Sequence, residues 1–254
     1  MSLHVEISPE VFAAAPDYLL ALVAVPAIEV RDADSGVEAL LTAAEDRLHA
    51  AGLDRPGVAA LPQIAAWRAA YQAVGISASR FPCAAESVLR RVAKGGRLPR
   101  INTLVDLCNA LSLESRLPVA AFSLEHVGPA LTIRRATGGE PFAPLGGGGV
   151  TEPVESGEVI YADGEGRAHS RRWNWRQGDL AKTLAGERRL LLTVESAHPG
   201  GPAEVEPAVR RLAAEVARLT GAAGSAGSVG EPVLLSAQRP GVRVFSDAVP
   251  AGAR

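Results

Sequence analysis

The spacing of apolar residues divides this chain into a mainly helical first half and a mainly extended second half. Over residues 35–51, 61–74, 82–93 and 102–115 the apolar side chains fall on one face of a helix, which predicts four amphipathic helices. The same pattern predicts a further helix over residues 204–219. Glycines follow several of these segments, and glycine is the common residue just past the end of a helix.

Short apolar or alternating segments elsewhere predict strands, separated by turns rich in proline and glycine. They cover residues 3–7, 18–25, 117–122, 130–135, 158–162, 169–175 and 188–194, with two more candidates at 233–235 and 242–245. Ser8 and Pro9 predict a helix start after the first strand. Helices followed by strands predict an α+β fold, in which helices pack on one side of an antiparallel or mixed sheet.

Composition changes this picture in two ways. Aromatic residues make up only 4% of the 254 residues, so we expect a core of alanine, leucine and valine. The net charge is -2, so a nucleic-acid-binding role would need a local basic patch. Cys83 and Cys108 have no metal-like spacing, and we expect two buried apolar cysteines, with no metal and no cofactor.

Neither a secretory signal nor a membrane span is expected. The first residues lack a basic segment before an apolar run, and the most apolar stretch, residues 18–28, is interrupted at Pro26 and is too short to cross a bilayer. We therefore expect a cytoplasmic protein with no membrane partner.

Five short motifs occur in an order that is informative as a set. Residues 102–109 read Asn-x-x-Val-Asp-x-x-Asn, and residues 118–123 read Pro-Val-Ala-Ala-Phe-Ser. Residues 139–146 form a Gly-Glu turn, residues 157–163 a strand that ends in Asp, and residues 191–197 a strand that ends in Glu-Ser-Ala. Together they resemble the B3/B4 domain of the phenylalanyl-tRNA synthetase beta subunit, in its free-standing form.

That resemblance implies a mixed or antiparallel sheet with helices packed on it, arranged as one domain over residues 1–254. The motif-bearing core covers about residues 67–197. A helix and linker follow over residues 203–230, with possible terminal strands over residues 231–247. Residues 221–230 are rich in small side chains and are expected to form a flexible linker.

The B3/B4 domain inspects and deacylates mischarged tRNA, so the resemblance implies a trans-acting editing hydrolase whose partner is the aminoacylated 3' end of tRNA, not DNA. One alternative is a non-catalytic module that binds RNA or a free amino acid. Another is a small-molecule enzyme or binder with a narrowed pocket. A complete synthetase is not expected, because the sequence has no ATP-binding signal.

Two departures and one match bear on the predicted activity. Ala120 stands where the family has a histidine, so any role of that histidine has no counterpart here. Residues 171–177, Arg-Arg-Trp-Asn-Trp-Arg-Gln, replace a glycine-rich wall of the editing pocket, so tyrosine is not expected to fit. Glu195 matches the carboxylate that recognises the noncognate side chain, which makes it a candidate specificity residue.

The chemistry of deacylation requires a positioned water, a proton acceptor and donors for the oxyanion. The histidines are scattered and no Gly-x-Ser-x-Gly motif is present, so the catalytic group is unassigned and positioning is expected to dominate. The residues predicted to form the substrate pocket are Asn102, Glu140, Trp173, Asn174, Trp175 and Glu195.

Several of these residues also have a structural explanation. Asn102, Asp106 and Asn109 share one helical face and form either a polar wall of the site or a cap and braces for the helix. If residues 171–176 are a strand, Trp173 and Trp175 share one face and the arginines Arg172 and Arg176 share the other. Asp163 is expected to brace a loop, and Glu140 either braces a loop or lines the site.

A basic stretch is the candidate surface for RNA. Its arginines would contact the acceptor end of tRNA, or else form a solvated helix face balanced by acids such as Glu86. The residues predicted to contact RNA are Arg80, Arg90, Arg91, Arg97, Arg100, Arg172 and Arg176.

Overall fold

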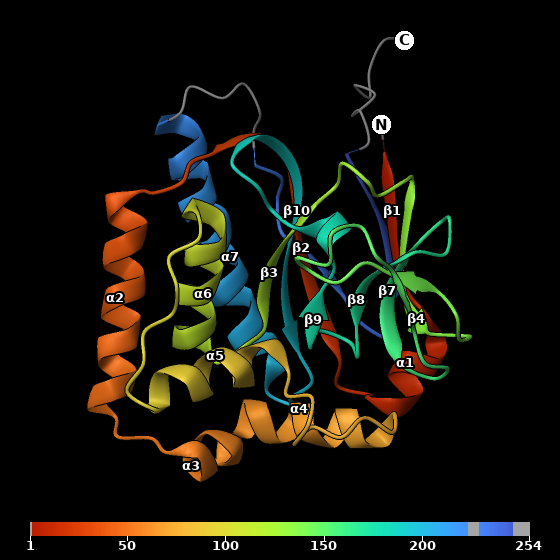
Figure 1. Cartoon of the computed structure of the whole chain (residues 1–254), viewed down its shortest axis with the longest axis horizontal. Coiled ribbons are helices and arrows are strands. Elements are labelled where there is room, and N and C mark those ends of the chain that lie inside the picture. Colours follow the sequence, from red (N-terminus) through yellow and green to blue (C-terminus); the bar gives the residue numbers. More distant parts are fainter. Residues whose placement is uncertain (1, 223–228, 246–254) are drawn as a thin grey trace.

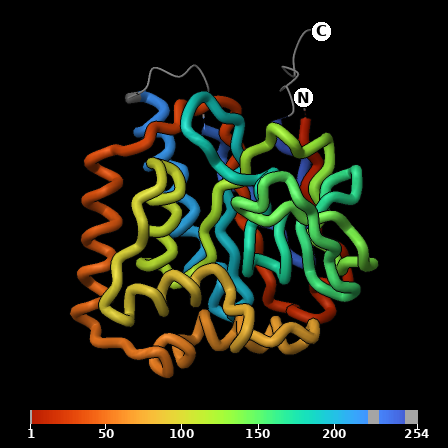
Figure 2. Tube along the Cα trace, viewed as in Figure 1, coloured from red at the N-terminus to blue at the C-terminus, as the bar shows by residue number. Residues whose placement is uncertain are grey.

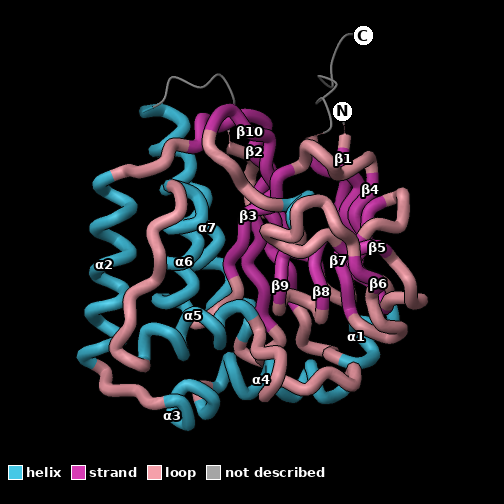
Figure 3. The backbone as a smooth tube through the Cα atoms, viewed as in Figure 1, coloured by secondary structure: helices cyan, strands magenta, loops and turns pink. Residues whose placement is uncertain are grey.

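Two β-sheets lie side by side in this protein, and helices cover the outer face of the smaller sheet (Figure 1). The computed structural model describes residues 2–222 and 229–245. Within them most of the helices gather on one side of the molecule and the strands on the other, while other helices run beneath the sheets, as Figure 3 shows. Part of the predicted linker, residues 223–228, lies outside the described residues.

The smaller sheet is antiparallel and has four strands in the order β11-β2-β10-β3 among the described residues. The bounds are Val233–Leu235 for β11, Leu19–Val30 for β2, Gly186–Ser196 for β10 and Val119–Ser123 for β3. The strand β2 continues past Pro26, whereas the sequence predicted only residues 18–25.

The larger sheet is mixed, because β1 is parallel to β4 and β5 is parallel to β8, while its other pairs are antiparallel. Its described strands are β12 (Gly241–Val244), β1 (Leu3–Ile7), β4 (Ala130–Arg135), β7 (Val159–Asp163), β8 (Ala168–Arg171), β5 (Pro141–Phe142), β6 (Glu152–Pro153) and β9 (Arg176–Gln177). Pairing of β1 with β12 brings the first and last described strands together, as the red and blue ends of the trace show in Figure 2.

The described helices are α1 (Pro9–Ala14), α2 (Ser35–Ala50), α3 (Arg55–Ala60), α4 (Pro62–Ala73), α5 (Ala84–Ala93), α6 (Thr103–Ser115) and α7 (Gly201–Ala222), with a 3-10 turn at Asp179–Ala181. Helices α6 and α7 pack on the smaller sheet, and α2 packs on α6. Helix α4 runs along the lower edge of the molecule in Figure 1. The short α3 was not predicted.

Both faces of the smaller sheet are buried, and alternation along its strands separates two cores. On β2, Leu20 and Leu22 belong to the core shared with the larger sheet, whereas Ala21 and Val23 belong to the core under the helices. On β10, Leu191 faces the larger sheet, so Glu195, four residues further along, faces the same way. The pattern thus directs a carboxylate into the space between the sheets.

The α+β class with a mixed sheet is confirmed. One local prediction is wrong. The segment 169–175 is not a continuous strand, because β8 ends at Arg171 and the chain then turns, with positive φ values of 46° at Arg172 and 65° at Trp173. The alternation predicted for the two tryptophans does not hold there.

Candidate functional site

A small cavity opens where the turn after β8 meets the edge strand β3 and helix α6. Its volume is about 180 Å³. Helix α6 contributes Cys108 and Asn109, β3 contributes Ala120, and the turn contributes Asn174. Glu195 reaches it from β10, the strand next to β3. We call this space the Glu195 cavity.

The turn is held in its unusual conformation by buried hydrogen bonds. The carboxylate of Glu158 accepts the backbone N–H of Arg172 at 3.1 Å and pairs with the guanidinium of Arg171 at 2.5 Å. The Ser170 hydroxyl donates to the backbone carbonyl of Trp173 at 2.6 Å. Positive φ at non-glycine residues is uncommon and persists where the surroundings determine it. These hydrogen bonds therefore hold the turn in a conformation that buries Trp173 and places Asn174 in the cavity wall.

Glu195 is a buried carboxyl group, only 2% exposed. The hydroxyl of Tyr18 donates to its Oε2 at 2.8 Å, and the hydroxyl of Tyr161 lies 3.3 Å from that of Tyr18. Burial raises the pKa of Glu195 to about 7, although the Tyr18, Tyr161 and Asn174 side chains act in the opposite direction. Glu195 therefore changes charge near neutral pH.

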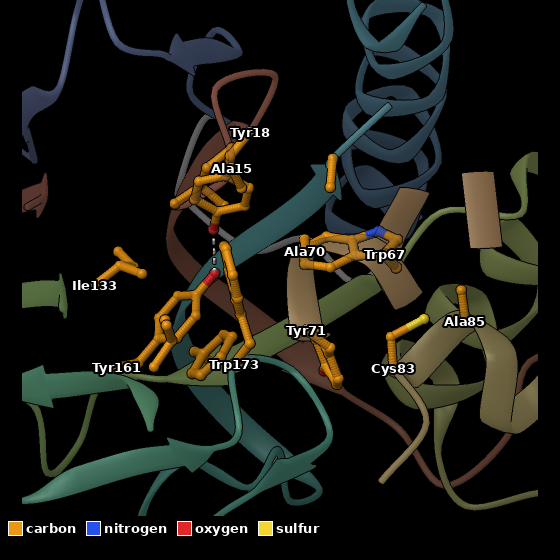
Figure 4. Packing of buried hydrophobic residues seen from close by; sticks show 14 of the residues in the cluster. Ala15, Tyr18, Trp67, Ala70, Tyr71, Cys83, Ala85, Ile133, Tyr161 and Trp173 are labelled. Atoms are coloured by element: carbon orange, nitrogen blue, oxygen red, sulfur yellow. Dashed lines mark hydrogen bonds between the residues drawn. The ribbon is translucent and has the colours of Figure 1, made fainter. Parts of the chain in front are cut away.

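Aromatic rings enclose Tyr18 on several sides. Its ring centroid lies 4.9 Å from that of Trp173 and 5.9 Å from that of Trp67, both edge to face. Figure 4 shows the hydroxyl groups of Tyr18 and Tyr161 pointing toward each other, with Trp173 beside Tyr161 and Tyr71 close by. Edge-to-face pairs add about 0.5–1.5 kcal/mol each beyond the area that they bury. This cluster holds the Tyr18 hydroxyl in the position from which it donates a hydrogen bond to Oε2 of Glu195.

The orientation of the Asn174 amide follows from its hydrogen bonds. Its Oδ1 accepts from the hydroxyl of Tyr71 at 2.9 Å and from the backbone N–H of Ala84 at 3.4 Å. Its Nδ2 is buried and has no hydrogen-bond partner within the described residues. The Asn174 side chain nevertheless lowers the pKa of the Glu195 carboxyl, so its N–H group lies near Glu195 without forming a hydrogen bond of ordinary geometry to it. The cavity thus offers an unused donor beside a carboxylate.

Aromatic and cationic side chains gather beside the cavity. The ring of Trp175, which lines the cavity, meets the ring of Phe81 at 4.8 Å. The guanidinium of Arg172 lies 3.9 Å from the centre of the Phe81 ring, and that of Arg176 lies 4.7 Å from the Trp175 ring. Arg80 stacks on Phe81 at 4.9 Å. We call these five residues the aromatic rim.

The structure brings together four of the predicted pocket residues: Trp173, Asn174, Trp175 and Glu195 all line the cavity. Asn102 does not line it, because its Oδ1 caps α6 by accepting from the backbone of Leu104 and Val105. Of the two interpretations of Asn102, the structure shows the helix cap.

Glu140 does not line the cavity either. It accepts hydrogen bonds from the backbone of Thr137 and Gly138 and pairs with Arg134 at 2.7 Å. These contacts lower the pKa of Glu140 to about 2, against the effect of its burial. Glu140 therefore braces its loop and lies outside the Glu195 cavity.

Other polar residues divide between bracing and lining. Asp106 accepts from the backbone of Ile101, and Asp163 accepts from the backbone of Glu165 and Arg167, so both act as braces. Asn109 lines the cavity, as the polar-wall interpretation of its helix face predicts.

Several of the arginines predicted to contact RNA are paired with carboxylates of the protein itself. Arg90 pairs with the buried Glu86 at 2.5 Å, and Arg97 and Arg100 pair with the buried Glu45 at 2.9 and 3.0 Å. Arg172 is buried and pairs with Glu155 at 3.0 Å. Carboxylates thus pair with four of the arginines predicted to contact RNA, and the acid is buried for Arg90, Arg97 and Arg100 but exposed for Arg172. Arg80, Arg91 and Arg176 are exposed, and so are Arg97 and Arg100.

Sequence reasoning missed the tyrosines. Tyr71 lies on α4, Tyr18 immediately precedes β2, and Tyr161 lies on β7 within the motif at residues 157–163, which did not single it out. The sequence offered one signal for them: aromatic residues make up only 4% of the chain, so each one is a candidate for a specific role. Within the described residues, no three His, Cys, Asp or Glu side chains lie close enough together to hold a metal ion.

Comparison with protein-family models identifies the family of this chain. A family model described as the B3/4 domain matches residues 66–220, which is more than half of the 254 residues. The chain therefore belongs to the B3/4 domain family, and the predicted resemblance is confirmed.

A solved structure of an N-terminal fragment of the phenylalanyl-tRNA synthetase beta subunit from Pyrococcus horikoshii is similar over 89% of this chain, with 12% identity and a TM-score of 0.42. The present chain spans about half of that fragment, 49% of its length. No curated protein matches the chain. No helix in residues 2–222 and 229–245 has the length and apolar character needed to cross a bilayer.

Proposed function

We propose that this protein is a trans-acting hydrolase that deacylates a mischarged aminoacyl-tRNA, with the aminoacyl group held in the Glu195 cavity. The observation that carries the proposal is the cavity itself, in which a buried carboxyl with a pKa of about 7 stands beside the unused N–H of Asn174. Membership of the B3/4 domain family supports the same reaction class.

The reaction needs little covalent chemistry from the protein. Water adds to the ester carbonyl, the bond to the ribose oxygen breaks, and that oxygen takes a proton, so that free amino acid and tRNA are released. The protein supplies orientation, since holding reactants in place lowers the barrier on its own. Ser170 is not a free nucleophile, because its hydroxyl is bonded to the carbonyl of Trp173 at 2.6 Å.

The proposal predicts a loss of hydrolysis when the cavity is altered. Glu195→Gln and Asn174→Ala are each expected to slow deacylation by about 10- to 100-fold, the effect of removing one hydrogen bond to a charged group. The measurement uses a panel of correctly and incorrectly charged radiolabelled tRNAs. Glu187→Gln is the matched control, because Glu187 lies on the same strand but is exposed.

One observation favours a second function, a binding module without hydrolysis. Ala120 lines the cavity where the resembled domain has a histidine, so the cavity wall lacks that imidazole. A panel in which no charged tRNA is hydrolysed, while one of them still binds, would establish this second function and reject the first.

Contact with tRNA is expected at the aromatic rim. Arg176 and Trp175 lie beside the cavity mouth, and stacking of a base on an aromatic ring contributes about 1–3 kcal/mol. Trp175→Ala is therefore expected to weaken tRNA binding about 5- to 150-fold. For Arg176→Ala, the slope of log K for tRNA binding against log salt concentration is expected to become less steep by about one.

Filter binding or fluorescence titration across a salt series measures both effects. Arg210→Ala serves as the control, because Arg210 is an exposed arginine on α7 that pairs with Glu206 on the same helix. Equal loss of affinity in the control and in the rim variants would place the RNA elsewhere.

A further inference from the structure

The charge inside the Glu195 cavity is unbalanced. Glu195 is the acidic residue in its lining, and no lysine, arginine or histidine is found among the described residues that form its walls. The side chains that act on the carboxyl, Tyr18, Tyr161 and Asn174, are all neutral. A buried carboxylate is stable when a cation or several donors compensate it. Here only neutral donors do so.

The contrast with other buried carboxylates in the molecule is direct. Glu45 pairs with Arg97 and Arg100, and Glu86 pairs with Arg68 and Arg90. Each of those acids is buried and is paired with guanidinium groups of the chain, and neither lines the cavity. Glu195 faces a hollow space instead, so the missing partner has room to come from outside the chain.

The rest of the cavity wall suits a cation. Aromatic side chains, among them Trp173, Trp175, Tyr161 and Phe122, line it. The face of an aromatic ring attracts a positive charge, most strongly for tryptophan. A volume of about 180 Å³ also limits the occupant to a small group. Carboxylate, aromatic walls and small size together describe a site for a compact organic cation.

We infer that the Glu195 cavity binds its ligand as a cation, with a primary ammonium group on the carboxylate of Glu195. This inference rests on the proposed function in one respect: for an aminoacyl ester, the ammonium is the α-amino group. Glu195 then anchors the substrate by its charge and does not recognise the amino-acid side chain, which is the role that the family resemblance implies for it; the side chain is sensed elsewhere in the cavity. The free amino group, which every aminoacyl-tRNA carries and a peptidyl or acylated tRNA lacks, becomes the recognised feature.

The decisive experiment compares two esters of one tRNA that differ only in this charge. One carries an amino acid, and the other carries the α-hydroxy acid of the same shape. Each enzymatic rate is divided by the uncatalysed rate of the same ester, because the ammonium itself makes an ester more labile. The wild-type protein is expected to accelerate hydrolysis of the aminoacyl ester at least about 10-fold more than that of the hydroxyacyl ester.

The Glu195→Gln variant distinguishes two roles for Glu195, binding the ammonium group of the substrate and accepting a proton in the reaction. An anchor predicts that the variant loses the preference for the aminoacyl ester and hydrolyses the hydroxyacyl ester as fast as the wild type does. If the variant slows both esters equally, or if the wild type accelerates both equally, the inference is wrong while the proposed hydrolysis stands. The Glu187→Gln control is expected to keep the wild-type preference.

A binding measurement decides the case in which neither ester is hydrolysed. Amides of small amino acids and the matching α-hydroxy amides are titrated against the protein, and tryptophan fluorescence reports occupancy because Trp173 and Trp175 line the cavity. Binding of the amino form alone, lost in Glu195→Gln, supports the ammonium site although the proposed hydrolysis has failed. Equal binding of both forms, or binding of neither, overturns the inference.

Discussion

Trp173→Ala is expected to lower the free energy of unfolding by about 3–5 kcal/mol, the usual cost of deleting a buried tryptophan side chain. Trp173 is fully buried and packs edge to face on Tyr18 and Trp67, with Tyr71 stacked at 6.3 Å. Its removal takes one wall from the Glu195 cavity and leaves the ring of Tyr18 without its nearest aromatic neighbour. Urea denaturation monitored by far-UV circular dichroism measures the change.

Trp175→Ala is the matched control for that experiment. Trp175 lies two residues away, is half-buried and packs on Phe81 at the rim, outside the main core. We expect it to lose no more than about 1.5 kcal/mol, the scale of one aromatic pair. Equal losses of unfolding free energy in the two variants would show that the packing of Trp173 contributes no more to stability than that of Trp175.

The ionisation of Glu195 is expected to make stability depend on pH. Its pKa is about 7 in the folded protein and starts from an ordinary value of 4.5. Between these two values the folded state holds a proton that the unfolded chain has released. Stability therefore falls as the pH rises from about 4.5 to 7 and is level above that, with a total effect of about 3 kcal/mol.

Glu195→Gln isolates this contribution, because glutamine cannot titrate. The difference in unfolding free energy between variant and wild type is expected to shift by about 3 kcal/mol in favour of the variant between pH 5 and pH 8. Using a difference is necessary because burial lowers the pKa of His169, which affects stability with the opposite sign. A difference that stays constant with pH would show that Glu195 is ionised throughout, and Glu187→Gln is expected to show no shift.

The motif at residues 102–109 illustrates why sequence patterns assign roles only in part. Asn102 and Asn109 are seven residues apart on one helix, and the pattern treats both as candidates for the same wall. Asn102 immediately precedes α6, and the backbone N–H groups in the first turn of a helix have no partner within the helix. The Asn102 side chain therefore accepts hydrogen bonds from two of them and caps the helix. Two turns later the backbone groups are satisfied within the helix, and Asn109 is available to the cavity.

The basic stretch shows a second limit. Sequence alone counts the arginines but does not show which carboxylates lie beside them in the fold. Glu45 is more than 50 residues from Arg97 and Arg100, yet it accepts hydrogen bonds from both, at 2.9 and 3.0 Å. Part of the positive charge of this stretch is therefore already balanced within the fold, although Arg97 and Arg100 remain exposed.

By itself the sequence determined the α+β class, most of the helices and strands, the family, and the burial of the two cysteines. These follow from local periodicity, capping residues and an ordered set of motifs. The tertiary structure decided which side chains share a cavity, since Tyr18 and Glu195 are 177 residues apart and meet only when β2 pairs with β10. It also decided the charge state of Glu195, because the pKa of a carboxyl depends on burial and on neighbours that local sequence does not specify.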